Sequence, residues 1–195
     1  MGLIIMLIYS VSSWIPTFIF RKFQVSSGEI GHLLGLVILL TALPGVIVGG
    51  WITDRKVAGG ADGIYLRLLL IGGALTALPL ILLPFASSIA AVLACVGVFF
   101  FLATLPNGVL VAYIQRVCPP SMRGTVSACY VLTVNMVGYL LGPTSVGYIS
   151  EALLNSDDSI GQALAILGVL ACIIATGIFY FGRKPALRLL SSASQ

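Results

Sequence analysis

Long apolar runs alternate with short polar connections along the whole chain. Each of six runs approaches or exceeds about 20 residues, the length that a helix needs to cross the hydrocarbon core of a bilayer. Inside lipid a backbone must satisfy its own hydrogen bonds, and a helix does so within one segment. The pattern predicts an all-α membrane protein with six transmembrane helices, at residues 3–20, 30–51, 64–85, 88–113, 121–150 and 160–181.

The composition agrees with a membrane protein and argues against several other classes. Apolar residues make up 59% of the chain, whereas soluble domains contain roughly 45–50%. The four cysteines show no Cys-x-x-Cys spacing, so we expect buried thiols and neither a metal site nor another cofactor. The sequence contains no nucleophile–base constellation or nucleotide-binding fingerprint that would indicate an enzyme. The net charge of +4 is explained by a membrane face, without nucleic acid as a partner.

The basic residues predict the orientation of the six helices. An even number of spans places both termini on one side, and eight of the ten Lys and Arg residues then fall on that side. Since cytoplasmic loops are rich in bases, both termini are predicted to be cytoplasmic. Arg21 and Lys22 disagree, because they follow the first run while no base precedes it. An upstream membrane segment would remove this conflict.

A short motif occurs twice, near the end of the second run and near the end of the fifth. GWITD at 50–54 and GYISE at 147–151 share a glycine, an aromatic residue, isoleucine, a hydroxyl and an acid. Each copy follows a proline, Pro44 or Pro143, and the two copies fall on opposite membrane faces. This arrangement is typical of an inverted three-plus-three repeat. We therefore expect a bundle at 1–182, with repeats at 3–85 and 88–181 and a short cytoplasmic tail at 183–195.

Several stretches resemble the major facilitator superfamily of secondary carriers. GWITDRK at 50–56 resembles its cytoplasmic loop signature, G-x-x-x-D-R-x-G-R-[RK], although VAGG at 57–60 replaces the last glycine and basic pair. WIPT at 14–17 resembles the seventh helix of such carriers. PSMRGT at 120–125, with Asn135 and Gly142-Pro143 after it, is similar to the Spinster-like branch. The chain thus resembles the C-terminal six-helix half of a twelve-helix transporter.

The resemblance implies transport of a small organic solute by alternating access, driven by an ion gradient. It also implies a second partner besides membrane lipid and solute, because the family builds one central cavity from two halves. That partner is a missing N-terminal half or a second copy of the chain. The implied location is the bacterial inner (plasma) membrane. A truncated, non-transporting membrane protein or a membrane scaffold is the alternative.

The resemblance also implies a cytoplasmic gate, formed by Gly50, Asp54, Arg55 and Arg116. In the family such an acid helps to hold the two halves closed on the cytoplasmic side. The carboxylate of Asp54 can accept hydrogen bonds from a helix N-terminus or an arginine. For Arg55, and for Lys56 beside it, a solvated turn that follows the positive-inside rule is the simpler explanation.

Polar residues within the runs are candidates for lining a substrate cavity. No Asp, Glu, Lys or Arg lies near the middle of a run, so this chain shows no proton-coupling acid. Pro16 and Pro106 predict breaks in the first and fourth helices, where carriers place substrate sites. The alternative for the two asparagines is a hydrogen bond between helices, and for Tyr139 it is packing. The candidates are Tyr9, Ser13, Thr17, Thr104, Asn107, Asn135 and Tyr139.

Overall fold

The computed structural model describes residues 1–25, 27–58, 71–154 and 159–193, and every regular element in these ranges is helical. The first elements are α1 (Gly2–Phe23), α2 (Ser27–Ala58), α4 (Ala77–Leu82) and the 3-10 turn η1 (Leu83–Phe85). They are followed by α5 (Ile89–Val117), α6 (Arg123–Ile149), the π-helical turn η2 (Ser150–Leu154) and α7 (Ser159–Ala193). Residues 71–75 are also helical and lead into α4.

The described helices occupy the six predicted runs. Five of them are long and apolar enough to cross a membrane, and the sixth, Ile71–Phe85, is shorter within the described residues. The prediction of an all-α protein with six helices is therefore confirmed, with residues 64–70 of the third run outside the described part. Helix α7 continues to Ala193. Most of the predicted tail is thus helical, and its cytoplasmic location stays a prediction.

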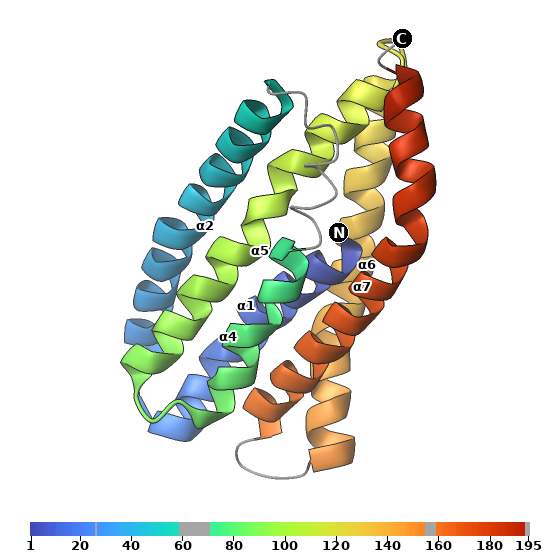
Figure 1. The fold of residues 1–195 in the computed structure, drawn as a ribbon. Coiled ribbons are helices and arrows are strands. Elements are labelled where there is room, and N and C mark those ends of the chain that lie inside the picture. The colour runs from blue at the N-terminus through green and yellow to red at the C-terminus, as the bar shows by residue number, and fades with distance from the viewer. Residues whose placement is uncertain (26, 59–70, 155–158, 194–195) are drawn as a thin grey trace.

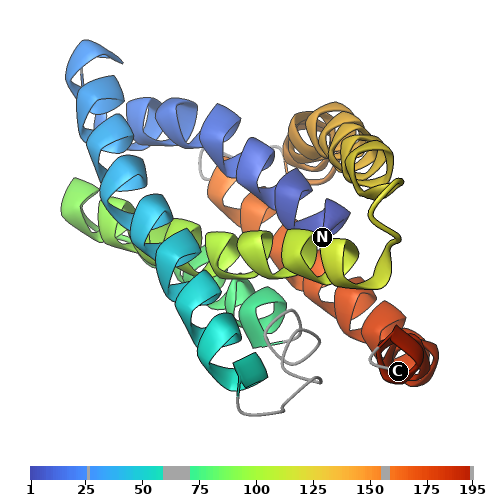
Figure 2. The same ribbon diagram turned by 90° about the horizontal axis from the view of Figure 1, so that it is seen from above.

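The helices run alternately between the two ends of an elongated bundle (Figure 1). Helices α2, α5 and α7 finish at the end where the C-terminus lies, whereas α1, η1 and α6 finish at the opposite end. Seen from above, α1 passes between α2 and α6 (Figure 2). This central position gives α1 a large share of the core, and Val11, Ile15, Phe18 and Ile19 are almost fully buried.

Two helices are left almost uncovered by the rest of the chain. Only 17% of the membrane-spanning part of α2 and 6% of that of α6 is buried within the chain, compared with 44% for α1 and for α5. Both helices carry large exposed apolar side chains along their length, including Trp51 and Tyr148. Apolar faces of this extent need lipid or further helices as neighbours.

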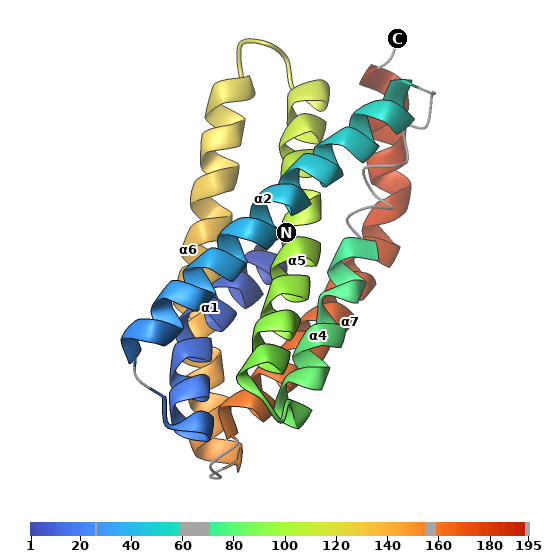
Figure 3. The same cartoon turned by 90° about the vertical axis from the view of Figure 1, so that its left-hand side faces the viewer.

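Glycines on these two helices allow close backbone contacts. Gly45 and Gly49 of α2 face the backbone of α5, and Gly138 and Gly142 of α6 face that of α1. Figure 3 shows α2 crossing α5 and α6 beside α1. A methyl group added at Gly142 would lie 2.5 Å from the carbonyl oxygen of Met6. Small residues let membrane helices approach closely, and these four glycines allow such an approach here.

Lys22 fastens the end of α1 to η1. Its Nζ donates a 2.8 Å hydrogen bond to the carbonyl oxygen of Pro84 and lies 5.4 Å from the centre of the Phe18 ring. The chain leaves α1 through Gln24, whose positive φ of 52° is the usual left-handed conformation at a helix end. The base that conflicts with the predicted orientation therefore binds a carbonyl near a helix C-terminus, where positive charge is favoured.

Candidate functional site

Three of the predicted cavity residues form one cluster at the contact between α1 and α6. The Tyr9 hydroxyl donates a 2.7 Å hydrogen bond to Asn135 Oδ1, and Asn135 Nδ2 donates to the carbonyl oxygen of Val131 at 2.8 Å. The rings of Tyr9 and Tyr139 meet edge to face with their centres 5.3 Å apart. Tyr139 is 66% exposed. The cluster therefore offers an accessible aromatic ring beside a hydrogen-bonded polar pair.

The hydrogen bond of Asn135 is the interhelical contact that the sequence left open as the alternative to cavity lining. Asn135 and Tyr9 are both half-buried, so the pair borders the exposed surface rather than the core. A tyrosine hydroxyl retains acceptor capacity after donating one hydrogen bond, and an amide nitrogen carries two hydrogens. The pair can thus hold the two helices together and still present one donor and one acceptor to a solute.

Trp14 ties α1 to α6 at a second point. Its Nε1 donates a 2.9 Å hydrogen bond to the carbonyl oxygen of Pro143, and Gly147 leaves room for the indole ring. Interhelical hydrogen bonds of this kind stabilise membrane bundles by about 0.6–2 kcal/mol. Trp14 is therefore a contact between α1 and α6 in this structure.

Ser13 and Thr17 lie further along α1, toward its C-terminal end. Ser13 is exposed and Thr17 is half-buried. Thr17 lines a cavity of about 240 Å³ together with Pro16, Phe20 and Ile30. This cavity adjoins the predicted break at Pro16, but α1 continues through the proline as one helix.

Thr104 occupies a different environment from the other candidates. It is 7% exposed, and its hydroxyl lies 3.0 Å from the carbonyl oxygen of Ala42 and 2.8 Å from that of Phe100. In this structure Thr104 is therefore a packing residue between α2 and α5, because its hydroxyl is already satisfied within the protein. Asn107, one turn further along α5, is half-buried, and its cavity role stays a prediction.

Three of the four predicted gate residues, Gly50, Asp54 and Arg55, lie near the C-terminal end of α2. Asp54 and Arg55 are exposed, and the Arg55 guanidinium lies 5.1 Å from the centre of the Trp51 ring. Gly50 is half-buried with open space where a side chain would be. Arg116 belongs to the last turn of α5, and its side chain is outside the described residues. The pairing of Asp54 with Arg116 therefore stays a prediction.

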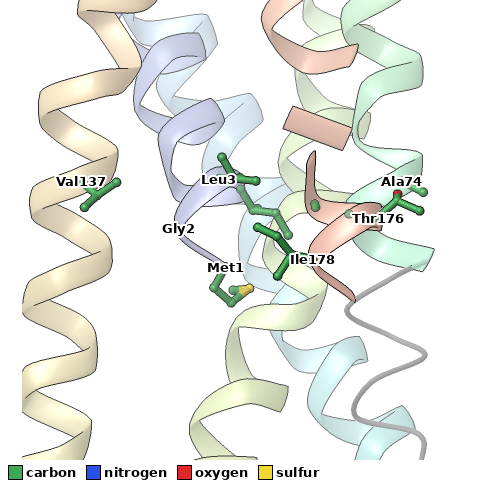
Figure 4. A pocket seen from close by; sticks show the side chains of 10 residues that line it. Met1, Gly2, Leu3, Ala74, Val137, Thr176 and Ile178 are labelled. Atoms are coloured by element: carbon green, nitrogen blue, oxygen red, sulfur yellow. The ribbon is translucent and has the colours of Figure 1, made fainter. Parts of the chain in front are cut away.

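A larger cavity, of about 380 Å³, lies where α1 begins, and the sequence did not indicate it. Four segments line it (Figure 4). They are the start of α1, residues 73–74, Val137 of α6, and Ala175, Thr176 and Ile178 of α7. The lining is apolar apart from a few groups, and the Thr176 hydroxyl already donates to the carbonyl oxygen of Cys172. None of the predicted cavity residues lines this space.

The long apolar helices define the class of the protein as a helical membrane protein that crosses the bilayer several times. The sequence profile of the Major Facilitator Superfamily matches residues 1–143, most of the chain. The chain belongs to this family, and the resemblance predicted from its motifs is confirmed.

Two comparisons relate the chain to known members. It is 31% identical over 170 residues to an MFS-type efflux pump of Mycolicibacterium smegmatis, and the match covers 82% of this chain and 37% of the pump. A bacterial homolog of the human lysosomal transporter Spinster, solved in an inward-facing and unoccupied conformation, superimposes with a TM-score of 0.75 at 15% identity. That superposition covers 98% of this chain and 47% of the homolog, and it shows a shared fold. The chain thus spans less than half the length of either protein.

Proposed function

We propose that the chain is one six-helix half of a secondary carrier that moves a small organic solute by alternating access. The observation that carries this proposal is the exposure of α2 and α6. Only 17% of the membrane-spanning part of α2 and 6% of that of α6 is buried within the chain. Nearly the whole chain superimposes on less than half of the Spinster homolog, which supports a partner of similar size. That partner is an N-terminal six-helix half or a second copy of the chain.

The cluster of Tyr9, Asn135 and Tyr139 is the best candidate for solute contact from this half. It combines an exposed ring with hydrogen-bonding groups, and small-molecule sites in proteins are mostly apolar with a few polar groups. Ser13, Thr17 and Asn107 extend the proposed lining. Since no Asp, Glu, Lys or Arg lies near the middle of a predicted membrane-spanning run, we assign ion coupling to the partner half.

Asp54 is proposed as the gate residue on the cytoplasmic face, in an inner membrane with both termini inside. Its carboxylate is exposed at the end of α2, one of the two uncovered helices, so it is accessible to a partner half. A carboxylate can accept hydrogen bonds from Arg116 and from a helix N-terminus together. Gly50 and Arg55 complete the proposed gate, with Arg55 held over Trp51.

Co-expression tests the half-carrier proposal. The chain is produced alone and with a complementary six-helix half, and accumulation of a panel of fluorescent organic solutes is measured in cells and in proteoliposomes. Export is tested first, since the relative from M. smegmatis is named an efflux pump. We expect transport only from the pair, and self-association of the chain alone through α2 and α6. A stable, fully monomeric chain that binds no second half would contradict the proposal and favour a self-contained membrane protein.

A further inference from the structure

The two copies of the repeated motif occupy equivalent environments in the folded chain. The hydroxyl residues are both buried, with Thr53 2% and Ser150 5% exposed. The aromatic residues before them are both exposed, Trp51 by 58% and Tyr148 by 71%. The acids at the end of each motif are exposed as well. The similarity of sequence is therefore accompanied by a similar pattern of burial.

The buried hydroxyls have local partners that hold each motif in place. Thr53 donates a 2.8 Å hydrogen bond to the carbonyl oxygen of Gly49. Ser150 lies 2.6 Å from Ser159, Oγ to Oγ, which ties the end of α6 to the start of α7. In both motifs the acid that follows belongs to a helical segment and not to a free turn.

The spacing from each acid back to a close helix contact is also the same. Gly45 and Gly142 each lie nine residues before the acid of their motif. Gly45 faces the Thr104 hydroxyl of α5, and Gly142 faces the Ser10 hydroxyl of α1. Each of these two hydroxyls lies within hydrogen-bond distance, 2.7–2.8 Å, of the carbonyl oxygen four residues earlier in its own helix. Helices α2 and α6 thus each pack closely against a neighbouring helix at a glycine, and in each the acid follows nine residues after that glycine.

The two acids nevertheless lie at opposite ends of the bundle. Helix α2 finishes at the end where the C-terminus lies, and α6 finishes at the other end (Figures 1 and 3). Glu151 belongs to the π-helical turn η2, and π-helical turns occur frequently at functional sites. Asp54 lies on α2 and Glu151 lies in η2, directly after α6, and α2 and α6 are the two largely exposed helices where a partner half is proposed to pack.

We infer that Glu151 is the gate carboxylate of the opposite membrane face, the counterpart of Asp54. This inference rests on the proposed function, because a gate requires a second half to close against. Asp54 is followed by Arg55 and Lys56, whereas Ala152 and Leu153 follow Glu151. The two residues that follow Glu151 thus supply no base, and the partner assigned to it is a cationic side chain of the other half. Glu151 pairs with that cation when the outer face is closed and is released when it opens.

The test measures which face of the carrier is open. In the assembly with the complementary half, all four native cysteines are replaced, and single cysteines report alkylation rates. Thr17→Cys reports access from the Glu151 end, and Asn107→Cys reports access from the Asp54 end. We expect Glu151→Gln to raise alkylation of Thr17→Cys and lower that of Asn107→Cys, each by about fivefold or more, the lower range of coupling between sites. Asp54→Asn should shift both rates in the opposite direction.

The controls separate a gate from a general loss of structure. Asp157→Asn removes an acid six residues further along the chain and should leave both rates unchanged. Glu151→Asp keeps the charge and should remain close to the parent. The double variant of Glu151→Gln with Asp54→Asn should return both rates toward the parent, which a misfolded protein would not do.

The outcomes distinguish the inference from the proposed function. If Glu151→Gln behaves like Asp157→Asn, or shifts the rates in the same direction as Asp54→Asn, the inference is wrong and the carrier proposal stands. If the parent assembly itself transports none of the panel and both reporters are unaffected by either gate variant, the proposed function fails and the inference fails with it.

Discussion

Gly142→Ala is expected to force α1 and α6 apart, because the added methyl group would meet backbone. It would lie 2.5 Å from the carbonyl oxygen of Met6 and 2.9 Å from the hydroxyl of Ser10. A carbon atom approaches a carbonyl oxygen to about 3.3–3.6 Å in helix interfaces, so the helices must separate by roughly 1 Å. That displacement would also stretch the 2.7 Å hydrogen bond from Tyr9 to Asn135.

The expected cost follows from these two effects. Overpacking a well-packed contact costs about 1–3 kcal/mol, and an interhelical hydrogen bond in a membrane protein contributes about 0.6–2 kcal/mol. We therefore expect the free energy of unfolding to fall by roughly 2–5 kcal/mol. Ser10→Ala should not rescue the variant, since the nearest atom belongs to the Met6 backbone and cannot be removed by substitution.

Reversible unfolding of the purified protein in mixed detergent micelles measures this loss. Gly35→Ala is the matched control, because Gly35 also lies in a membrane-spanning helix and has nothing within 4 Å of the position of an added methyl group. The control should change the free energy of unfolding by less than about 1 kcal/mol. If Gly142→Ala were as stable as this control, the close contact between α1 and α6 would not exist in solution.

Three further predictions use the same protein. Trp14→Phe removes the 2.9 Å hydrogen bond to α6 and should lower the free energy of unfolding by about 0.6–2 kcal/mol in the same micelles; no loss would mean that the indole makes no net contribution. Asp54→Asn should slow transport by the assembly more than Arg55→Gln does, since only the carboxylate can accept from a helix end and an arginine; equal, mild losses would return the motif to a solvated turn. Single cysteines at Lys56 and Asp157 should react with impermeant reagents from opposite sides of the membrane, and labelling from one side would refute the six-span topology.

The number of helices could be predicted from the sequence because a bilayer imposes a minimum apolar length on each of them. Which face of each helix packs against the rest of the chain could not be predicted from the sequence. Thr104 shows why: its hydroxyl is satisfied partly by the Phe100 carbonyl of its own helix, so a polar residue in an apolar run need not face a cavity. In soluble proteins amphipathicity indicates the buried face, but α2 and α6 also expose large apolar side chains along much of their length.

The cluster at the contact between α1 and α6 was only partly predictable. The spacing of Asn135 and Tyr139 indicated that they share a face of one helix, and the structure places them together with Tyr9. Their alignment with α1 depends on Gly138 and Gly142, and nothing in the sequence specifies which residues of a second helix a glycine will meet. The hydrogen bond from Trp14 to a backbone carbonyl leaves no sequence signal at all, since any residue supplies that acceptor.

The bond from Lys22 to Pro84 has a consequence for the order in which the helices become fixed during biosynthesis. Its donor and acceptor lie 62 residues apart, so the acceptor enters the membrane long after α1 has left the ribosome. Until the stretch Ile71–Phe85 has been made, this bond cannot form. The C-terminal end of α1 is therefore fixed to η1 only after the third of the predicted runs is in place.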